Sequence, residues 1–182
     1  VLAQNIPESI GNWDTSSVTD MRGIFIGAQS IPESIGNWNT RSLTNMVVIF
    51  GRSKKAPESI GKWDTSKVTD MSSLFELVQN IPESIGNWNT NNVTKMTNMF
   101  KKAQNIPGSI GNWNTSNVTD MNRMFKKAQN IPESIGKWDV SKVTDMTQIF
   151  EGVQNVPKSI SNWKTNILNL KVDEERQNQK MV

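Results

Sequence analysis

Cysteine, histidine and tyrosine are absent from this sequence of 182 residues. Without cysteine the chain has no disulfide and no thiolate that could bind a metal or attack a substrate. Without histidine it lacks the commonest general base and the side chain that changes charge near neutral pH. No apolar run approaches the roughly 18 residues of a membrane-spanning helix. We therefore expect no enzyme activity, no catalytic residue, no metal and no cofactor.

What the sequence contains is a 25-residue repeat that runs without insertion or deletion from Ile6 toward the C-terminus. Residues 81–103, IPESIGNWNTNNVTKMTNMFKKA, show it clearly. All the tryptophans, prolines and phenylalanines keep fixed places in it: Trp13, Trp38, Trp63, Trp88, Trp113, Trp138 and Trp163; Pro7, Pro32, Pro57, Pro82, Pro107, Pro132 and Pro157; Phe25, Phe50, Phe75, Phe100, Phe125 and Phe150. A fixed period in the twenties predicts a solenoid whose units bury their apolar sides against each other.

Within one unit the residue types predict a strand, a turn and a short helix. A proline such as Pro7 suits the start of a strand, and 8–13 is the strand candidate. Thr19 is a candidate helix N-cap. Helical spacing follows in the apolar residues Val18, Met21, Ile24, Phe25 and Ala28. Stacked strands repeat at about 4.8 Å and packed helices at roughly 8–10 Å, so the array should curve. The predicted fold is an α/β repeat solenoid, a right-handed arc with a short parallel sheet on its concave face and short helices on its convex face.

The signature I-x2-W-[DN]-T-S-x-V-T-[DN]-M-x2-[MIL]-F reads WDTSKVTDMSSLF at 63–75 and WNTSNVTDMNRMF at 113–125. It resembles the 25-residue repeats of mycoplasma-type and other bacterial surface proteins, akin to BspA-like leucine-rich repeats, over roughly residues 4–168. The resemblance implies a leucine-rich-repeat-like solenoid on the cell surface, often on a lipoprotein, that serves adhesion or partner binding. The family has no agreed catalytic residue, and the lipid-bearing cysteine of a lipoprotein is absent from this chain.

The two ends depart from the repeat. Residues 1–5 match the end of a unit and predict a truncated upstream repeat, whereas 6–168 form seven repeats, the last incomplete. Residues 169–182 are expected to form a C-terminal cap and a polar tail, with a last strand near Leu168, Leu170 and Val172. No cap is visible at the N-terminus, so the first unit should expose an apolar edge, and end-to-end self-association is expected there.

Two polar registers on the predicted strand are the candidate ligand-binding residues. One is a carboxylate row, and the other consists of asparagine and lysine: Glu8, Glu33, Glu58, Glu83 and Glu133; Asn12, Asn37, Lys62, Asn87, Asn112 and Lys137. Like charges stacked at about 4.8 Å repel unless solvent or a partner compensates them. The rows therefore indicate either a polar concave strip for a basic or hydroxyl-rich ligand or a solvated face inherited by duplication. Asparagines can also hydrogen-bond along the stack and stabilise it.

Two further charged groups have a chemical and a structural interpretation. An acidic and amide register could suggest calcium, but turn or capping chemistry explains it better: Asp14, Asn39, Asp64, Asn89, Asn114 and Asp139. Lys101, Lys102, Lys126 and Lys127 could contact phosphate, anionic glycan or lipid headgroups, or could complement helix dipoles and aid solubility. No aromatic platform or motif accompanies these lysines, so no specific nucleic-acid partner is expected.

An apolar surplus is predicted on the convex side. Val47 and Val48 stand where other units carry small or polar residues, and Ile26 and Leu77 add to them in the neighbouring units. The surplus indicates either a partner surface or local repacking beside the smaller residues Ser53 and Ala56.

These patterns favour a non-enzymatic, surface-displayed binding module that mediates adhesion to a host or neighbouring-cell protein or glycan through its concave strand face. The alternative is a structural spacer or repetitive surface antigen with no defined ligand. Localisation is expected at the extracellular side of the membrane, with attachment only through segments outside this chain.

Overall fold

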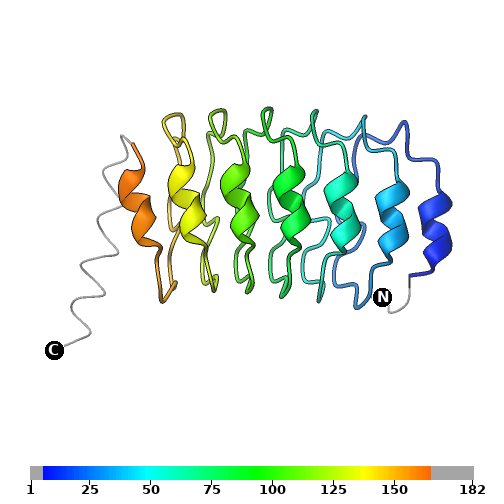
Figure 1. The fold of residues 1–182 in the computed structure, drawn as a ribbon, viewed down its shortest axis with the longest axis horizontal. Coiled ribbons are helices and arrows are strands. Elements are labelled where there is room, and N and C mark those ends of the chain that lie inside the picture. Colours follow the sequence, from blue (N-terminus) through cyan, green and yellow to red (C-terminus); the bar gives the residue numbers. More distant parts are fainter. Residues whose placement is uncertain (1–5, 165–182) are drawn as a thin grey trace.

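The structure, a computed structural model, describes residues 6–164 as one row of stacked units (Figure 1). Each unit contributes a short 3-10 helix to the same side of the row, and each helix packs only against its neighbours in sequence. The helices are η1 (Glu8–Asn12), η2 (Glu33–Asn37), η3 (Glu58–Lys62), η4 (Glu83–Asn87), η5 (Gly108–Asn112), η6 (Glu133–Lys137) and η7 (Lys158–Asn162). Between residues 6 and 164 there is neither an α-helix nor a β-strand. The predicted α/β, leucine-rich-repeat-like arc with a parallel sheet and convex helices is therefore wrong.

The segment predicted as a strand is the 3-10 helix. Pro7 leads into η1 with φ −73° and ψ 149°. The N–H of Ile10 then donates to Pro7 O at 3.1 Å, and the N–H of Trp13 donates to Ile10 O at 3.1 Å. A strand would send Ile10 and Trp13 to opposite faces, whereas three residues per turn align both toward the core. Burial of the equivalent pair in the next unit, Ile35 and Trp38, favours the 3-10 helix.

A glycine in each of the helices η1 to η6 permits the close approach of the next helix. A Cβ atom built on Gly36 would lie 2.5 Å from the Cβ of Ser59, and one on Gly86 would lie 2.4 Å from the Cβ of Ser109. Any side chain at these positions would collide with the neighbouring unit. The glycine therefore serves the contact between units rather than a bend in a strand.

The segment predicted as a convex helix is a succession of turns. In the first unit the N–H groups of Ile24 and Ala28 donate to the carbonyls three residues earlier, at 3.3 and 3.1 Å. Gly23 and Gly27 adopt φ of +67° and +69°, and later units place residues such as Val48 and Leu77 in the same left-handed region, at 56° and 66°. A left-handed residue at every fourth position interrupts an α-helix. The helix prediction failed because consecutive turns also return apolar residues to one side every three or four positions.

Backbone hydrogen bonds join the turn segments of adjacent units, mostly in one direction. The N–H groups of Met21, Gly23, Phe25 and Gly27 donate to carbonyls of the next unit at 2.9–3.4 Å. The intervening residues form the turn bonds, so an exchange of bonds as between strands is confined to single residues such as Asn45, whose N–H donates back to Thr19 O at 3.2 Å. Only isolated parallel bridges result, as in the series that begins with Asp20 and Asn45. Thr19 is no helix cap, because turns rather than a helix follow it. Its carbonyl instead accepts the N–H of Thr44 at 2.9 Å.

Two aromatic columns run through the core. In five of the six consecutive tryptophan pairs, all but Trp63–Trp88, the rings stack at 6.1–6.5 Å between centroids. Consecutive phenylalanine rings stack at 5.6–5.9 Å. Around the columns lie buried Ile, Val, Leu and Met side chains from the first six units, which confirms the predicted core registers. Since equivalent rings are farther apart on the tryptophan side, the 3-10 helices occupy the wider side of the row. The residues predicted to line a concave strand face therefore lie on the wider, helical side.

Several expectations concern residues outside 6–164: the upstream repeat at 1–5, the strand near Leu168 and the cap and tail at 169–182. Among the residues that the structure describes, no helix is long and apolar enough to cross a membrane.

Candidate functional site

The predicted carboxylate row lies on the helical side of the molecule. Each glutamate is the first residue of its 3-10 helix and is exposed to solvent. The register is interrupted at η5 and η7, which begin with Gly108 and Lys158. The structure thus gathers the carboxylates on one face, as the sequence indicated, but on helices rather than strands.

Four of the five carboxylates accept backbone hydrogen bonds from the next unit. The two oxygens of Glu33 accept the N–H groups of Glu58 at 3.1 Å and Ser59 at 2.8 Å. Glu83 and Glu133 make the same paired contact at 3.0–3.2 Å and 2.9–3.1 Å, and one oxygen of Glu58 accepts Ser84 N–H at 3.1 Å. The first N–H groups of a helix have no partner within that helix, so each carboxylate acts as an N-cap supplied by the preceding unit. We call these contacts the glutamate caps.

The caps favour the charged form of the carboxylates. The backbone N–H of Ser159 is the largest cause that holds the pKa of Glu133 below its ordinary value, followed by the Ser159 side chain and the N–H of Lys158. At Glu33 partial burial is the largest influence and raises the pKa, but the hydrogen bonds from Ser59 and Glu58 outweigh it, so the pKa is lowered. The like-charge row is therefore compensated within the molecule, and a binding role for it stays a prediction.

The neighbouring register has no such internal role. We call it the Asn/Lys row; it lies at the last position of each 3-10 helix: Asn12, Asn37, Lys62, Asn87, Asn112, Lys137 and Asn162. All its members are exposed. Within residues 6–164 none of their side chains makes a hydrogen bond or an ion pair. The predicted stabilising asparagine stack is thus not formed in this register, and its amides and ammonium groups face solvent.

The candidate anion-binding lysines fall into two kinds on the turn side. Lys101 pairs with Glu76 at 3.0 Å, and Lys126 pairs with Glu151 at 2.9 Å. Lys102 and its counterpart one unit later, Lys127, are exposed, adopt left-handed φ and make no ion pair among the described residues. Two of the four predicted cationic side chains are therefore neutralised. The sequence signals this, because Glu76 and Glu151 occupy the register of Lys101 and Lys126 in the flanking units.

The acidic and amide register forms turns, which confirms that interpretation. The side-chain oxygen of Asp14 accepts the N–H of Ser16 at 3.0 Å, and every member of the register repeats this bond at 2.9–3.4 Å. In the described part of the chain no group of three or more acidic, histidine or cysteine side chains is arranged to hold a metal ion.

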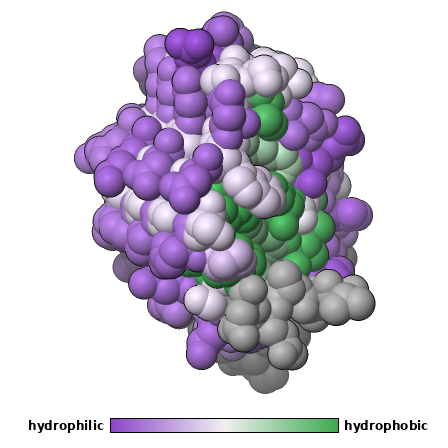
Figure 2. Space-filling view, turned by 90° about the vertical axis from the view of Figure 1, so that its right-hand side faces the viewer, coloured by the Kyte–Doolittle hydropathy of each residue, from purple (hydrophilic) through white to green (hydrophobic). Residues whose placement is uncertain are grey.

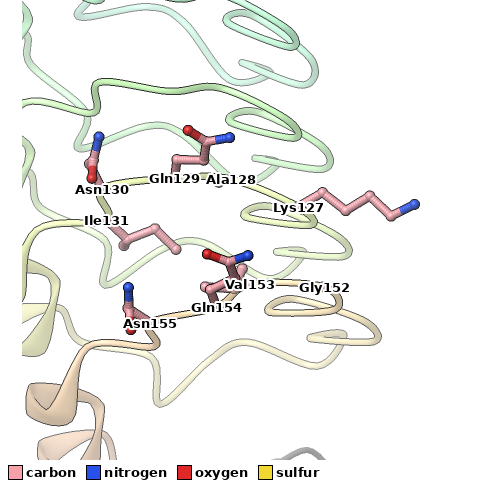
Figure 3. A pocket seen from close by; sticks show the side chains of 9 residues that line it. All are labelled: Lys127, Ala128, Gln129, Asn130, Ile131, Gly152, Val153, Gln154 and Asn155. Atoms are coloured by element: carbon pink, nitrogen blue, oxygen red, sulfur yellow. The ribbon is translucent and has the colours of Figure 1, made fainter.

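A polar crevice of about 260 Å³ opens between two units near the C-terminal end (Figure 3). An asparagine ladder ends there: Asn105 donates to Asn80 at 3.1 Å and Asn130 donates to Asn105 at 3.2 Å, but within 6–164 no such bond joins Asn130 to Asn155. Lys127 points away from the crevice in the same view. The crevice is smaller than the roughly 300–1,000 Å³ of ordinary ligand pockets and gathers no catalytic pair.

An apolar patch, surrounded by hydrophilic surface, lies on the end of the row that begins with η1 (Figure 2). Trp13 is 59% exposed there, while Ile24 and Ile26 are 42% and 40% exposed. Self-association through this end stays a prediction. Of the other predicted apolar patch, Ile26 and Leu77 are 40% and 36% exposed, whereas Val47 and Val48 are half-buried.

Comparison with known sequences identifies the family. The profile of the family described as Mycoplasma protein of unknown function, DUF285, matches residues 2–106 and 69–175. No curated protein matches the chain. The two overlapping matches together span most of the sequence and follow the tandem repeat seen in the structure. The chain therefore belongs to this mycoplasma repeat family.

Proposed function

We propose that this chain is a non-enzymatic binding module, displayed at the cell surface, that engages a protein or glycan of a host or neighbouring cell. Kinship with BspA-like surface repeats, a lipoprotein context and a role in adhesion belong to the same proposal. Attachment to the membrane would come from segments outside this chain.

The Asn/Lys row carries the proposal. Its side chains recur once per unit on a rigid scaffold and make no hydrogen bond or ion pair within 6–164. Many weak polar contacts presented at fixed spacing can add to useful affinity and specificity. By contrast, the glutamates beside the row are engaged as caps, so the binding surface that we propose uses the row rather than the carboxylates.

The test measures binding of the protein to an array of matrix proteins, cell-surface proteins and glycans at low and physiological salt. The variant replaces Asn37, Asn87 and Asn112 with alanine. The control replaces three exposed amides outside the row, Gln29, Gln79 and Gln129, with alanine. Both variants should have the melting temperature of the parent protein, because the replaced side chains have no hydrogen-bond or ion-pair partner within 6–164.

Selective binding at physiological salt that only the row variant loses would support the proposal. Binding that vanishes with salt and ignores the row variant would instead indicate the exposed lysines Lys102 and Lys127. No binding by the parent protein would favour the second candidate, a structural spacer. The phenylalanine column, which is continuous from Phe25 to Phe150 and lengthens with each repeat, favours that candidate.

A further inference from the structure

The spacing of the Asn/Lys row can be bounded from the columns beneath it. Equivalent rings repeat at 5.6–5.9 Å in the phenylalanine column and at 6.1–6.5 Å in the tryptophan column, so the spacing grows toward the helical side. Each row residue directly precedes a tryptophan and lies outside it, exposed to solvent. The row therefore repeats at the tryptophan spacing or slightly more.

That interval matches an extended polypeptide. An extended chain advances about 3.3–3.4 Å per residue, so alternate residues on one face recur at roughly 6.6–6.8 Å, and less when the strand twists. A carboxamide has donors and an acceptor, so one asparagine can bond to both the C=O and the N–H of a single peptide residue. One unit of the row would therefore engage every second residue of the ligand.

Chemistry on the same face argues against other polymers. The tryptophans are buried, except Trp13 at the end, so no aromatic platform is available for sugars or bases along the row. The glutamate caps place carboxylates beside the row, which disfavours a polyanion such as nucleic acid. The row itself contains only two cations, Lys62 and Lys137, and neither forms an ion pair within the described residues.

The distance between these two lysines determines which positions of an extended ligand they can both contact. Lys62 and Lys137 end η3 and η6, which are three units apart. At two ligand residues per unit, acidic residues about six positions apart would meet both lysines. We propose that the Asn/Lys row binds an extended polypeptide that runs along the row and carries two acidic residues with this separation. The proposal rests on the proposed function and specifies its ligand class.

The test compares three end-blocked peptides of about 13 residues, the length that spans the seven positions of the row. All alternate serine and threonine. The first has glutamates six positions apart, the second has them three positions apart, and the third has lysines in place of the glutamates of the first. Fluorescence anisotropy with the full chain at low salt measures the affinities. A glycan array is measured in parallel.

The first peptide should bind about three- to five-fold more tightly than the second, since it alone reaches both lysines, and the third should bind weakest. Lys62→Gln should abolish the preference, Lys62→Arg should retain it, and Asn87→Ala should weaken both acidic peptides. Gln79→Ala should change nothing.

Equal binding of the first two peptides, or a preference that survives Lys62→Gln, would overturn the inference. Glycan binding that depends on the row, without peptide binding, would also overturn it but would leave the binding module intact. Absence of binding to any probe would overturn both proposals.

Discussion

The two long sides of the row are joined in different ways. On the turn side the backbone itself connects adjacent units, through four N–H groups per unit that donate at 2.9–3.4 Å in the first unit. On the helical side the connections come from side chains: the glutamate caps, a serine hydroxyl and the tryptophan indole, which donates from Trp88 to Ile60 O at 2.8 Å. The helical side is also the wider one. The turn side therefore sets the stacking of the units, whereas the helical side tolerates variation at its exposed positions.

The largest effect should come from the indole that fills the helical side. Trp88→Ala should destabilise the array by roughly 3–5 kcal/mol because it removes a buried ring, its stacking on Trp113 and the indole hydrogen bond to Ile60 O. Chemical denaturation measures the change. Asn87→Ala, one residue away and exposed without a bonding partner within 6–164, should change stability by less than about 0.5 kcal/mol. Equal losses from the two variants would mean that the tryptophan column does not support the stack.

A cap can be removed from one unit and added to another. Glu83→Ala should cost roughly 0.5–2 kcal/mol, since the N–H groups of Gly108 and Ser109 lose their acceptors. Unit five supplies no cap to η6, because Gly108 stands at the glutamate position. A Cβ at Gly108 would meet nothing within 4 Å. Gly108→Glu should therefore stabilise the array by about 0.5–1 kcal/mol. Thermal melts of the two variants should shift in opposite directions; a loss of stability in Gly108→Glu would contradict this account.

On the turn side, two adjacent serines provide a matched test of backbone strain. Ser73 adopts φ +55°, and its neighbour Ser72 is not among the residues with positive φ. A left-handed L-residue costs roughly 1–2 kcal/mol, and glycine removes that cost at an entropic penalty of about 0.5–1 kcal/mol. Ser73→Gly should thus stabilise by up to about 1 kcal/mol, and Ser72→Gly should destabilise by a similar amount. Denaturation midpoints that move the same way would show that the left-handed position is not strained.

The smallest effect concerns pH. The pKa values of Glu133 and Asp139 are lowered in the folded protein, chiefly by the N–H of Ser159 and by the side chain of Ser141 respectively. A lowered folded pKa stabilises the protein above the unfolded value near 4, and this stabilisation is lost as the pH falls through the folded pKa. Melting temperatures should therefore decline below about pH 4.5 and stay flat between about pH 6 and 8, where no histidine titrates. A marked change across the neutral range would contradict it.

The period of the fold and its buried registers could be predicted from the sequence, because identical spacing of large apolar residues has one physical solution, the stacking of successive units. The local conformations could not. A six-residue segment with apolar groups three apart suits a 3-10 turn as well as a bent strand, and Val48 and Leu77 give no local sign of their left-handed φ. Only the hydrogen bonds between units determine these choices.

The candidate site was predictable in the same limited sense. The sequence placed Glu33 and Asn37 on one surface, and the structure places them on one helix. It could not distinguish their roles, because the N–H groups that Glu33 accepts lie 25 and 26 residues away. Capping rules read from the sequence consider only neighbours within a few positions.

The restriction of hydrogen bonds and ring contacts to neighbouring units has a mechanical consequence. Because each unit is held only by the units next to it, tension on one end concentrates on the outermost interface, whose turn bonds and aromatic contacts break before those of the next unit are loaded. A pulled molecule should lengthen in steps, and each released repeat of 25 residues should add roughly 80–90 Å of extended chain. A repeat array that is held at one end and pulled at the other would in this way unfold one unit at a time, while the remaining units stay folded.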